Sequence, residues 1–294
     1  MQFRRTTKSP ELQEEPSSVT NIFMNRPYSI KIYLPDGTPD GLKIIEKSNW
    51  NGKGVVCPRS SFPDNKAREE FSRTGIYILL GPSEQSDVNM LYVGQGDPIK
   101  RRLDSHYANK DFWTRAVFFV SKDDNLNKAH IGHLESKLIT MATEAKRCLL
   151  DNQNCPALPS MSEMDVADAE GFLEEILLCL PVLGINEFNK PEANVLKNKS
   201  RLFLKGPNCR AEGKETAEGL TVFEGAHARI EETASIHKYM TDARENLLRR
   251  EIFKEEEGKY ILTQDYTFSS PSAAAAIFLA RNANGRTEWK DSTG

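Results

Sequence analysis

TGIYILLGPSEQSDVNMLYVGQGDPIKRRLDSH, residues 74–106, is the stretch that decides the fold. Two runs in it, GIYILLG and NMLYVGQG, are rich in aliphatic and aromatic residues and are separated by a polar loop, which predicts a hairpin or two neighbouring strands. The segment DPIKRRLDSHYANK follows directly and predicts a helix, in which Asp97 is the N-cap and Pro98 the first residue. Each of two strands thus carries a tyrosine, and a basic helix comes immediately after them.

Strands and helices continue beyond the basic helix. RAVFFVS, residues 115–121, predicts a third strand. The apolar residues of NKAHIGHLESKLITMATEAKR recur at helical spacing and predict an amphipathic helix. After the loop DNQNCPALPS, the segment SEMDVADAEGFLEEILLCLPVLG predicts another helix, with an acidic first turn and an end at Pro181.

The flanking segments predict three further parts. Residues 1–25 are polar and predict a mobile tail, and residues 26–70 predict a small β-meander followed by a short charged helix, DNKAREEFSR. A polar linker is expected near residues 189–200. Residues 201–294 predict a separate C-terminal α+β domain, because the strand-like runs RLFLKG, GLTVFEG and KYILTQDYTF occur there together with two helical segments. The helical segments are ASIHKYMTDARENLLRREIF, which starts at Ala234, and SSPSAAAAIFLARN, which Ser269 or Ser270 is expected to cap.

Composition limits the classes of protein to consider. The length of 294 residues suggests about two domains, and a net charge of −3 means that any nucleic-acid binding must come from a local basic surface. The start of the chain has no apolar signal-peptide core, and the longest apolar runs are too broken to span a bilayer, so no membrane association is expected. The five cysteines form no CxxC pair, which favours cytoplasmic thiols over disulfides or a cysteine zinc site.

The region around the two tyrosines resembles the GIY-YIG endonuclease family. The resemblance covers roughly residues 71–155 and rests on the triplet GIY, the triplet YVG and three polar residues in the two following helices, which together are Tyr77, Tyr92, Arg102, His106 and Glu135. It implies that residues 71–190 form a nuclease domain with the α+β fold of that family, a small antiparallel sheet flanked by helices.

The resemblance also implies a role for each of these side chains. Tyr77 would act as the general base or relay a proton, and Tyr92 would position water or phosphate. Arg102 would stabilise the charge that develops at phosphorus, and His106 would hydrogen-bond the phosphate or the base tyrosine. Glu135 would be the single protein ligand of a divalent metal ion, Mg²⁺ or Mn²⁺.

Further site residues follow from the same resemblance and from the local sequence. The family carries a polar residue, often Asn, after the glutamate helix; Asn152 and Asn154 both qualify, and Asn154 is preferred. Gly94 would let the backbone approach the phosphate closely. Cations in the basic helix and in the aromatic-rich segment NKDFWTR are expected to contact nucleic acid, namely Lys100, Arg101, Lys110 and Arg115.

Elementary chemistry supports the same reading of the residues. Cleavage of a phosphodiester needs an activated water, stabilisation of charge at phosphorus and help for the leaving oxygen. An arginine presents a fixed fork of donors to phosphate oxygens, and Arg102 and His106 are four residues apart, so they share one helix face. A carboxylate such as Glu135 is a hard oxygen ligand suited to Mg²⁺.

Each residue taken singly also has a structural interpretation. The tyrosines could pack a half-buried strand face, Arg102 could be a solvated helix cation, and Glu135 could pair with Lys128. It is the order of five residue types that favours a nuclease. Two other patterns are rejected: GQG lacks the third glycine of a dinucleotide loop, and the pair His130 and His133 does not share a helix face with Glu135.

The expected function is that of a bacterial-type, metal-dependent endonuclease that hydrolyses nucleic-acid phosphodiesters, with DNA as the expected substrate and defence or restriction as a plausible setting. The alternatives are a catalytically weak nucleic-acid-binding or adaptor protein and a repair-type nickase. The C-terminal segment resembles an uncharacterised domain found at the end of bacterial GIY-YIG proteins, and it could recognise substrate or dock a protein partner. Its candidate contacts are Arg281, Arg286, Trp289 and Lys290.

Overall fold

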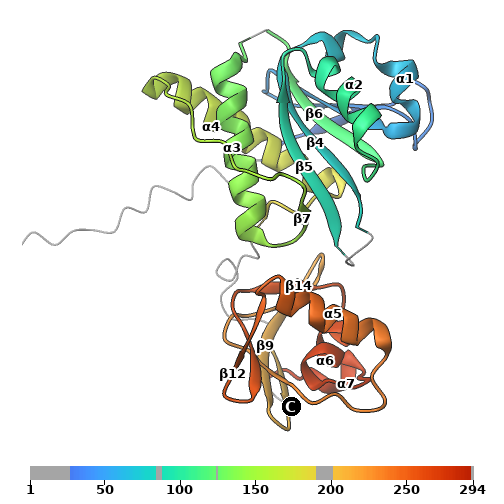
Figure 1. Cartoon of the computed structure of the whole chain (residues 1–294), viewed down its shortest axis with the longest axis vertical. Coiled ribbons are helices and arrows are strands. Elements are labelled where there is room, and N and C mark those ends of the chain that lie inside the picture. The colour runs from blue at the N-terminus through green and yellow to red at the C-terminus, as the bar shows by residue number, and fades with distance from the viewer. Residues whose placement is uncertain (1–26, 84–87, 124, 190–200, 293–294) are drawn as a thin grey trace, which may run out of the picture.

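The computed structural model describes residues 27–83, 88–123, 125–189 and 201–292, and within them the chain forms two bodies, each an α+β arrangement around its own sheet (Figure 1). The predicted tail at residues 1–25 and nearly all of the predicted linker lie outside the described residues. No helix in the described ranges has both the length and the apolar character needed to cross a bilayer.

The first body is built on a seven-stranded sheet with the strand order β1-β2-β3-β6-β4-β5-β7. Its pairs are antiparallel except for the last, because β5 and β7 run parallel. The strands are β1 (Ile30–Tyr33), β2 (Lys43–Lys47), β3 (Gly52–Pro58), β4 (Gly75–Pro82), β5 (Asn89–Gly96), β6 (Arg115–Ser121) and β7 (Leu149–Leu150).

The predicted β-meander is part of this sheet. Strand β3 pairs with β6 along its whole length, from Gly52 opposite Ser121 to Pro58 opposite Arg115. The boundary expected at residue 70 therefore lies within one sheet, and the meander adds three strands to the small sheet that the family resemblance implies.

Within the described residues, four helices flank the sheet: α1 (Phe62–Asn65), α2 (Ile99–Asn109), α3 (Lys128–Ala145) and α4 (Glu163–Cys179). The single charged helix expected around residues 64–73 is wrong, because α1 ends at Asn65 and only a 3₁₀ turn, Glu69–Ser72, follows. The prediction that Asp97 caps α2 is also wrong. Pro98 occupies the N-cap position, and the Asp97 carboxylate instead accepts a hydrogen bond from the Thr74 hydroxyl at 2.7 Å.

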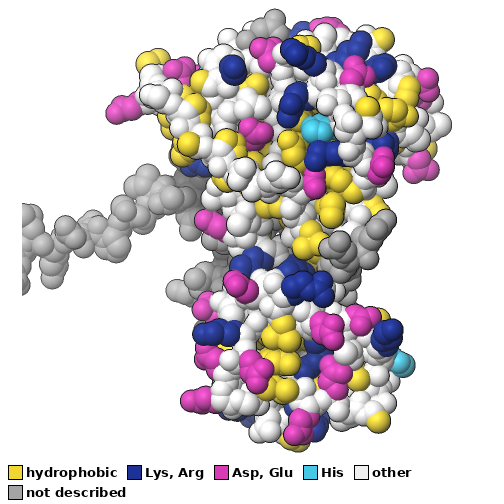
Figure 2. Space-filling model, in the orientation of Figure 1, with side chains coloured by type: hydrophobic (Ala, Val, Ile, Leu, Met, Phe, Trp, Pro, Cys, Tyr) yellow, Lys and Arg dark blue, Asp and Glu magenta, His cyan; other side chains and the backbone are white. Residues whose placement is uncertain are grey.

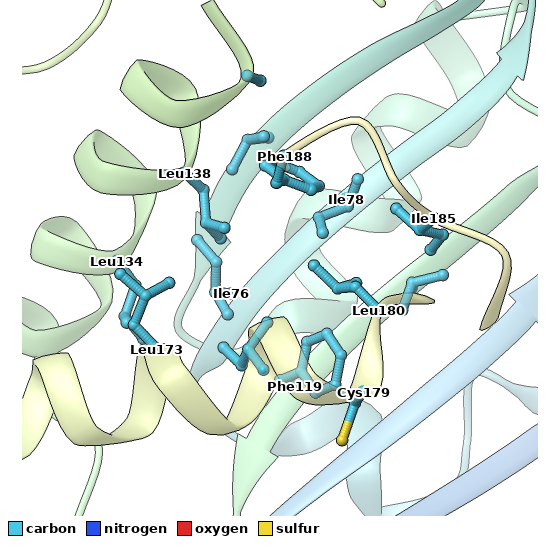
Figure 3. Packing of buried hydrophobic residues seen from close by; sticks show 14 of the residues in the cluster. Ile76, Ile78, Phe119, Leu134, Leu138, Leu173, Cys179, Leu180, Ile185 and Phe188 are labelled. Carbon is cyan, nitrogen blue, oxygen red and sulfur yellow. The ribbon is translucent and has the colours of Figure 1, made fainter. Parts of the chain in front are cut away.

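Both faces of the central strands are buried, which explains why β4 is apolar along its length. Side chains alternate across a strand, so Ile76 and Ile78 pack with Phe119 against α3 and α4 (Figure 3). Tyr77 and Leu79 point to the opposite face, where α2 covers them. This alternation places the first tyrosine of the pattern on the same side of the sheet as the basic helix.

The second body has its own core and a second seven-stranded sheet. Six strands follow the order β12-β13-β11-β9-β10-β14, and β8 pairs with β9. Its elements are β8 (Arg201–Gly206), β9 (Cys209–Thr216), β10 (Gly219–Val222), β11 (His227–Arg229), α5 (Lys238–Arg249), β12 (Phe253–Glu256), β13 (Lys259–Leu262), β14 (Tyr266–Phe268), α6 (Pro271–Leu279) and α7 (Gly285–Glu288). We call this body, residues 201–292, the C-terminal module.

Two expectations for the C-terminal module need correction and one is confirmed. The segment KYILTQDYTF forms two strands, β13 and β14, because the chain turns between them at residues 263–265. Helix α5 begins only at Lys238, four residues after the predicted start. Ser270 caps α6 by accepting a hydrogen bond from the Ala273 N–H, which was one of the two caps expected.

Candidate active site

The two tyrosines lie side by side on the face of the sheet that α2 covers. Tyr77 on β4 is opposite Gly94 on β5, and Tyr92 is opposite Leu79, so the two phenol rings are diagonal neighbours. Their centroids are 6.2 Å apart and their planes differ by 27°. Gly94 is required here for a reason that the sequence did not reveal, because a Cβ at this position would lie 2.3 Å from the Tyr77 hydroxyl.

Helix α2 places Arg102 and His106 over these phenols. The His106 Nε2 atom is 2.7 Å from the Tyr77 hydroxyl, and the His106 ring meets the Tyr92 ring edge-on at 4.9 Å. The guanidinium of Arg102 lies close enough to both tyrosines for their phenol groups to raise its pKa. Arg102 is exposed to solvent, Tyr92 is half-buried, and the Tyr77 side chain is fully buried. Four of the predicted residues therefore form one contiguous cluster with an open side at Arg102.

The surroundings keep both members of the Tyr77–His106 pair uncharged at neutral pH. Burial raises the pKa of Tyr77 above its ordinary value, and the nearby Tyr92 raises it further. Burial and the neighbouring cations Arg102 and Lys110 lower the pKa of His106 from 6.5 to about 4. A neutral imidazole can accept a hydrogen bond from the neutral phenol, so the surroundings do not hold Tyr77 as a ready-formed phenolate.

The low pKa of His106 predicts a loss of stability in mild acid. Between pH 6.5 and 4 the unfolded chain binds a proton at this residue and the folded chain does not, so the free energy of unfolding falls as the pH falls. The loss attributable to His106 is on the order of 3 kcal/mol across this window. Chemical denaturation of wild type and His106→Gln at pH 7 and pH 4.5 measures it: the variant should lose less stability, and an equal loss in both proteins would contradict the assignment.

Glu135 reaches the same cluster from α3, across the edge of β5. One of its carboxylate oxygens accepts a hydrogen bond from the Gln95 side-chain amide at 2.8 Å. Burial raises the pKa of Glu135, while the bond to Gln95 and the charge of Arg102 oppose that rise. The charge of Glu135 acts on Tyr77 and the charge of Arg102 acts on Glu135, so the carboxylate lies near the cluster.

Asn152, rather than Asn154, touches the site. Its side-chain oxygen accepts a hydrogen bond from the Val93 N–H at 2.9 Å, and its side-chain NH₂ donates one to the Val93 carbonyl at 2.8 Å. Just beyond the end of β7, the Asn152 side chain therefore makes the hydrogen bonds to β5 that a neighbouring strand would make. Val93 lies between Tyr92 and Gly94. Asn154 is exposed to solvent two residues further on. The geometry therefore favours the alternative that sequence reasoning ranked second.

Asn152→Ala should destabilise the first body strongly. The substitution leaves the N–H and C=O of Val93, whose side chain is fully buried, without their partners, at a cost of about 2–4 kcal/mol. Asn154→Ala should change the free energy of unfolding by less than about 0.5 kcal/mol, as is usual at exposed positions. Urea denaturation of the two variants compares them directly, and equal effects would contradict the role of Asn152.

The cations predicted to contact nucleic acid have different surroundings. Arg101 is exposed and Lys100 half-exposed on α2. Lys110 lies 4.6 Å over the Tyr92 ring and pairs with Asp151, at the margin of the site. Arg115 is at the start of β6, where it donates to the Leu183 carbonyl at 3.3 Å, so the structure gives it an internal partner. Figure 2 shows Lys and Arg interspersed with acidic side chains over the visible face of this body.

Two residues of the site were missed from the sequence, Gln95 and Asp151. Gln95 directly follows the YVG triplet, but nothing in a single sequence indicates that its side-chain amide hydrogen-bonds Glu135, 40 residues later. Asp151 precedes Asn152, and its contact with Lys110 depends on how the loop after α3 returns to the sheet.

The donor set fits a metal ion held by few protein ligands. Within the described residues there is no group of three or more His, Cys, Asp or Glu side chains placed to share a metal ion. Mg²⁺ keeps several waters and needs only one or two carboxylates, so the half-buried Glu135 suits such an ion. The two histidines of α3 have acidic partners away from Glu135. The Nε2 atom of His133 is 2.8 Å from a Glu170 carboxylate oxygen, and the Nε2 atom of His130 is 3.4 Å from an Asp165 carboxylate oxygen.

Comparison with known proteins identifies one region of the chain. A family model described as "Domain of unknown function (DUF4357)" matches residues 202–294. Neither the curated proteins nor the solved structures contain a match to this chain. The matched range coincides with the C-terminal module. The comparisons therefore say nothing about the first body, and a function for it has to be inferred from the geometry of its residues.

Proposed function

We propose that the protein is a metal-dependent endonuclease of the GIY-YIG type that hydrolyses phosphodiester bonds, with DNA as the expected substrate. The observation that carries the proposal is the cluster of Tyr77, Tyr92, Arg102 and His106 on the face of the sheet that α2 covers, which Glu135 approaches from α3 across the edge of β5. These are the residue types that water activation and phosphate stabilisation require.

The exposed guanidinium of Arg102 is the first contact for a phosphate. It is a planar fork that can bind two phosphate oxygens at once, and its charge opposes the negative charge that accumulates at phosphorus during attack. In the structure the same fork lies close to both phenols. A bound phosphate would compete for these donors and draw Arg102 outward, away from the Tyr77 hydroxyl.

Tyr77 and His106 would then move one proton. Water gives its proton to the Tyr77 oxygen as it attacks phosphorus, while the Tyr77 hydroxyl passes its own proton to the unprotonated ring nitrogen of His106 at 2.7 Å. The imidazolium that forms is stabilised by the negative charge developing on the phosphate. Tyr92, half-buried next to both residues, would orient the water or the phosphate.

Glu135 is the residue that would hold a divalent ion. Mg²⁺ bound there would supply a Lewis acid for a phosphate oxygen and neutralise charge on the leaving group. The role of the chain is to fix the carboxylate, and the side-chain amide of Gln95 does so by donating a hydrogen bond to it. Asn152 in turn holds the segment of β5 that carries Tyr92 and Gln95.

A second function, nucleic-acid binding without cleavage, is favoured by one observation. The Tyr77 side chain has 0% of its surface exposed, so water reaches its hydroxyl only after a rearrangement at Arg102. In that case the same basic helix would bind phosphates and no hydrolysis would follow.

A cleavage assay separates the two functions. The purified full-length chain is incubated with supercoiled plasmid DNA and, separately, with single-stranded RNA, in Mg²⁺ and in EDTA, and binding to both is measured by fluorescence anisotropy. The proposal expects DNA to be nicked or cut in Mg²⁺ and not in EDTA. Binding without cleavage under all these conditions would refute the nuclease and establish the alternative.

A further inference from the structure

The C-terminal module contacts the first body at one place that matters for the site. Helix α3, which carries Glu135, ends at Ala145, and we call residues 145–147 the α3 corner. Three separate parts of the C-terminal module meet it: the β9–β10 turn at Glu218, the end of α5 at Arg250 and Glu251, and the β13–β14 loop at Gln264. Figure 1 shows the C-terminal end of α3 directed at this module.

These contacts satisfy backbone groups that a helix end leaves unpaired. The last carbonyls of an α-helix lack intrahelical partners and carry partial negative charge. The Gln264 amide donates to the Ala145 carbonyl at 3.2 Å, and the Arg250 guanidinium donates to the Lys146 carbonyl. Lys146 itself adopts the left-handed conformation, with φ of 50°, that ends the helix. The module thus supplies the C-cap partners of α3.

Charge pairs reinforce the same contact in both directions. Lys146 approaches the Glu251 carboxylate at 3.8 Å, and Arg147 pairs with Glu218. Arg250 is itself positioned by Tyr266, whose hydroxyl accepts from it at 3.4 Å, and its charge acts on the buried thiol of Cys148 in the first body. Figure 2 shows Lys and Arg side chains gathered where the two bodies meet.

The α3 corner leads directly into the segment that covers the edge of β5. Two residues after it begins β7, which pairs with Met90 and Leu91, and Asn152 then binds Val93. In the other direction Glu135 lies ten residues before Ala145, about 15 Å along a continuous helix. Contacts that hold the α3 corner in place therefore also hold helix α3, which carries Glu135, and the segment that carries Asn152 against β5.

We propose that the C-terminal module is a positioning module for the candidate active site, which acts by capping α3 through Arg250 and Gln264. Arg250 is a positioning residue, since it touches neither the tyrosine cluster nor Glu135. The part of this inference that concerns catalysis rests on the proposed nuclease function, whereas the part that concerns β5 and the corner does not.

Hydrogen exchange of the full-length protein tests the inference with and without activity. Arg250→Ala is compared with Arg249→Ala, a matched control in which the neighbouring exposed arginine of α5 is removed. The inference expects Arg250→Ala to speed exchange of peptides covering residues 145–152 and 89–96 by about tenfold, because a charged donor to a backbone carbonyl is lost. Arg250→Lys, which keeps the charge but not the fork, should fall between wild type and alanine.

The exchange results at the two peptides test docking and positioning separately. Exchange at residues 145–152 that is equal in Arg250→Ala and Arg249→Ala would overturn the docking, and faster exchange there without any change at residues 89–96 would overturn the positioning. In the cleavage assay, Arg250→Ala is expected to lower kcat three- to tenfold and to leave KM unchanged. If exchange is faster at both peptides but kcat is unchanged, the link between positioning and catalysis is overturned. If wild type cleaves nothing, the nuclease proposal fails and the exchange data alone judge the positioning of β5.

Discussion

Arg102→Ala is expected to lower the rate of DNA cleavage by about 10²- to 10³-fold, the loss typical when one preorganised donor to a developing charge is removed. The guanidinium is exposed and lies close to both phenols. The loss should appear in kcat, because the fork would bind the phosphate most strongly in the transition state. Single-turnover cleavage of plasmid DNA in saturating Mg²⁺ measures it.

Arg101 provides the contrast for this prediction. It is exposed at the adjacent position of α2. Arg101→Ala should weaken DNA binding and reduce its salt dependence, while kcat at saturating DNA stays close to wild type. Equal losses of kcat in the two variants would show that Arg102 acts as a general phosphate contact and not at the scissile bond.

Glu135→Gln is expected to lower cleavage by about 10³-fold, because a metal ion contributes several kcal/mol of charge stabilisation to such a reaction. The substitution keeps the size of the side chain and an oxygen that can still accept from Gln95, so the local structure should persist. Only the charge that would attract the ion is removed. Cleavage rates across a Mg²⁺ titration, and Mn²⁺ binding followed by electron paramagnetic resonance, measure the two consequences separately.

Glu144→Gln is the matched control, because Glu144 is an exposed carboxylate on the same helix. It should leave both Mn²⁺ binding and cleavage at the wild-type level. Tight Mn²⁺ binding that survives in Glu135→Gln would show that the ion is held elsewhere, and a cleavage rate that survives would remove Glu135 from the reaction.

Local pattern was sufficient to predict most strands and helices of the first body, although not the charged helix expected at residues 64–73. Side-chain alternation and helical periodicity depend on neighbours within a few residues, and these gave β4, β5, β6, α3 and α4 close to their observed ranges. The order of residue types then predicted that Tyr77, Tyr92, Arg102 and His106 share a site, and the register of β4 and β5 shows why they meet.

Features of the fold and of the site that depend on contacts between residues far apart in the sequence could not be predicted. The extent of the sheet needed the pairing of β3 with β6, which joins segments about 60 residues apart. The choice between Asn152 and Asn154 needed the path of the chain after α3, since both residues fit the pattern equally well. The cap expected at Asp97 failed because Thr74, 23 residues earlier, takes its carboxylate.

The most direct test of the central claim is a crystal of the full-length protein with Mn²⁺ and a short DNA duplex that carries a non-hydrolysable phosphorothioate. The account predicts an anomalous scattering peak at the carboxylate of Glu135 and a phosphate within hydrogen-bonding distance of Arg102. A manganese ion bound away from Glu135, or DNA lying on the opposite face of the sheet over α3 and α4, would contradict it.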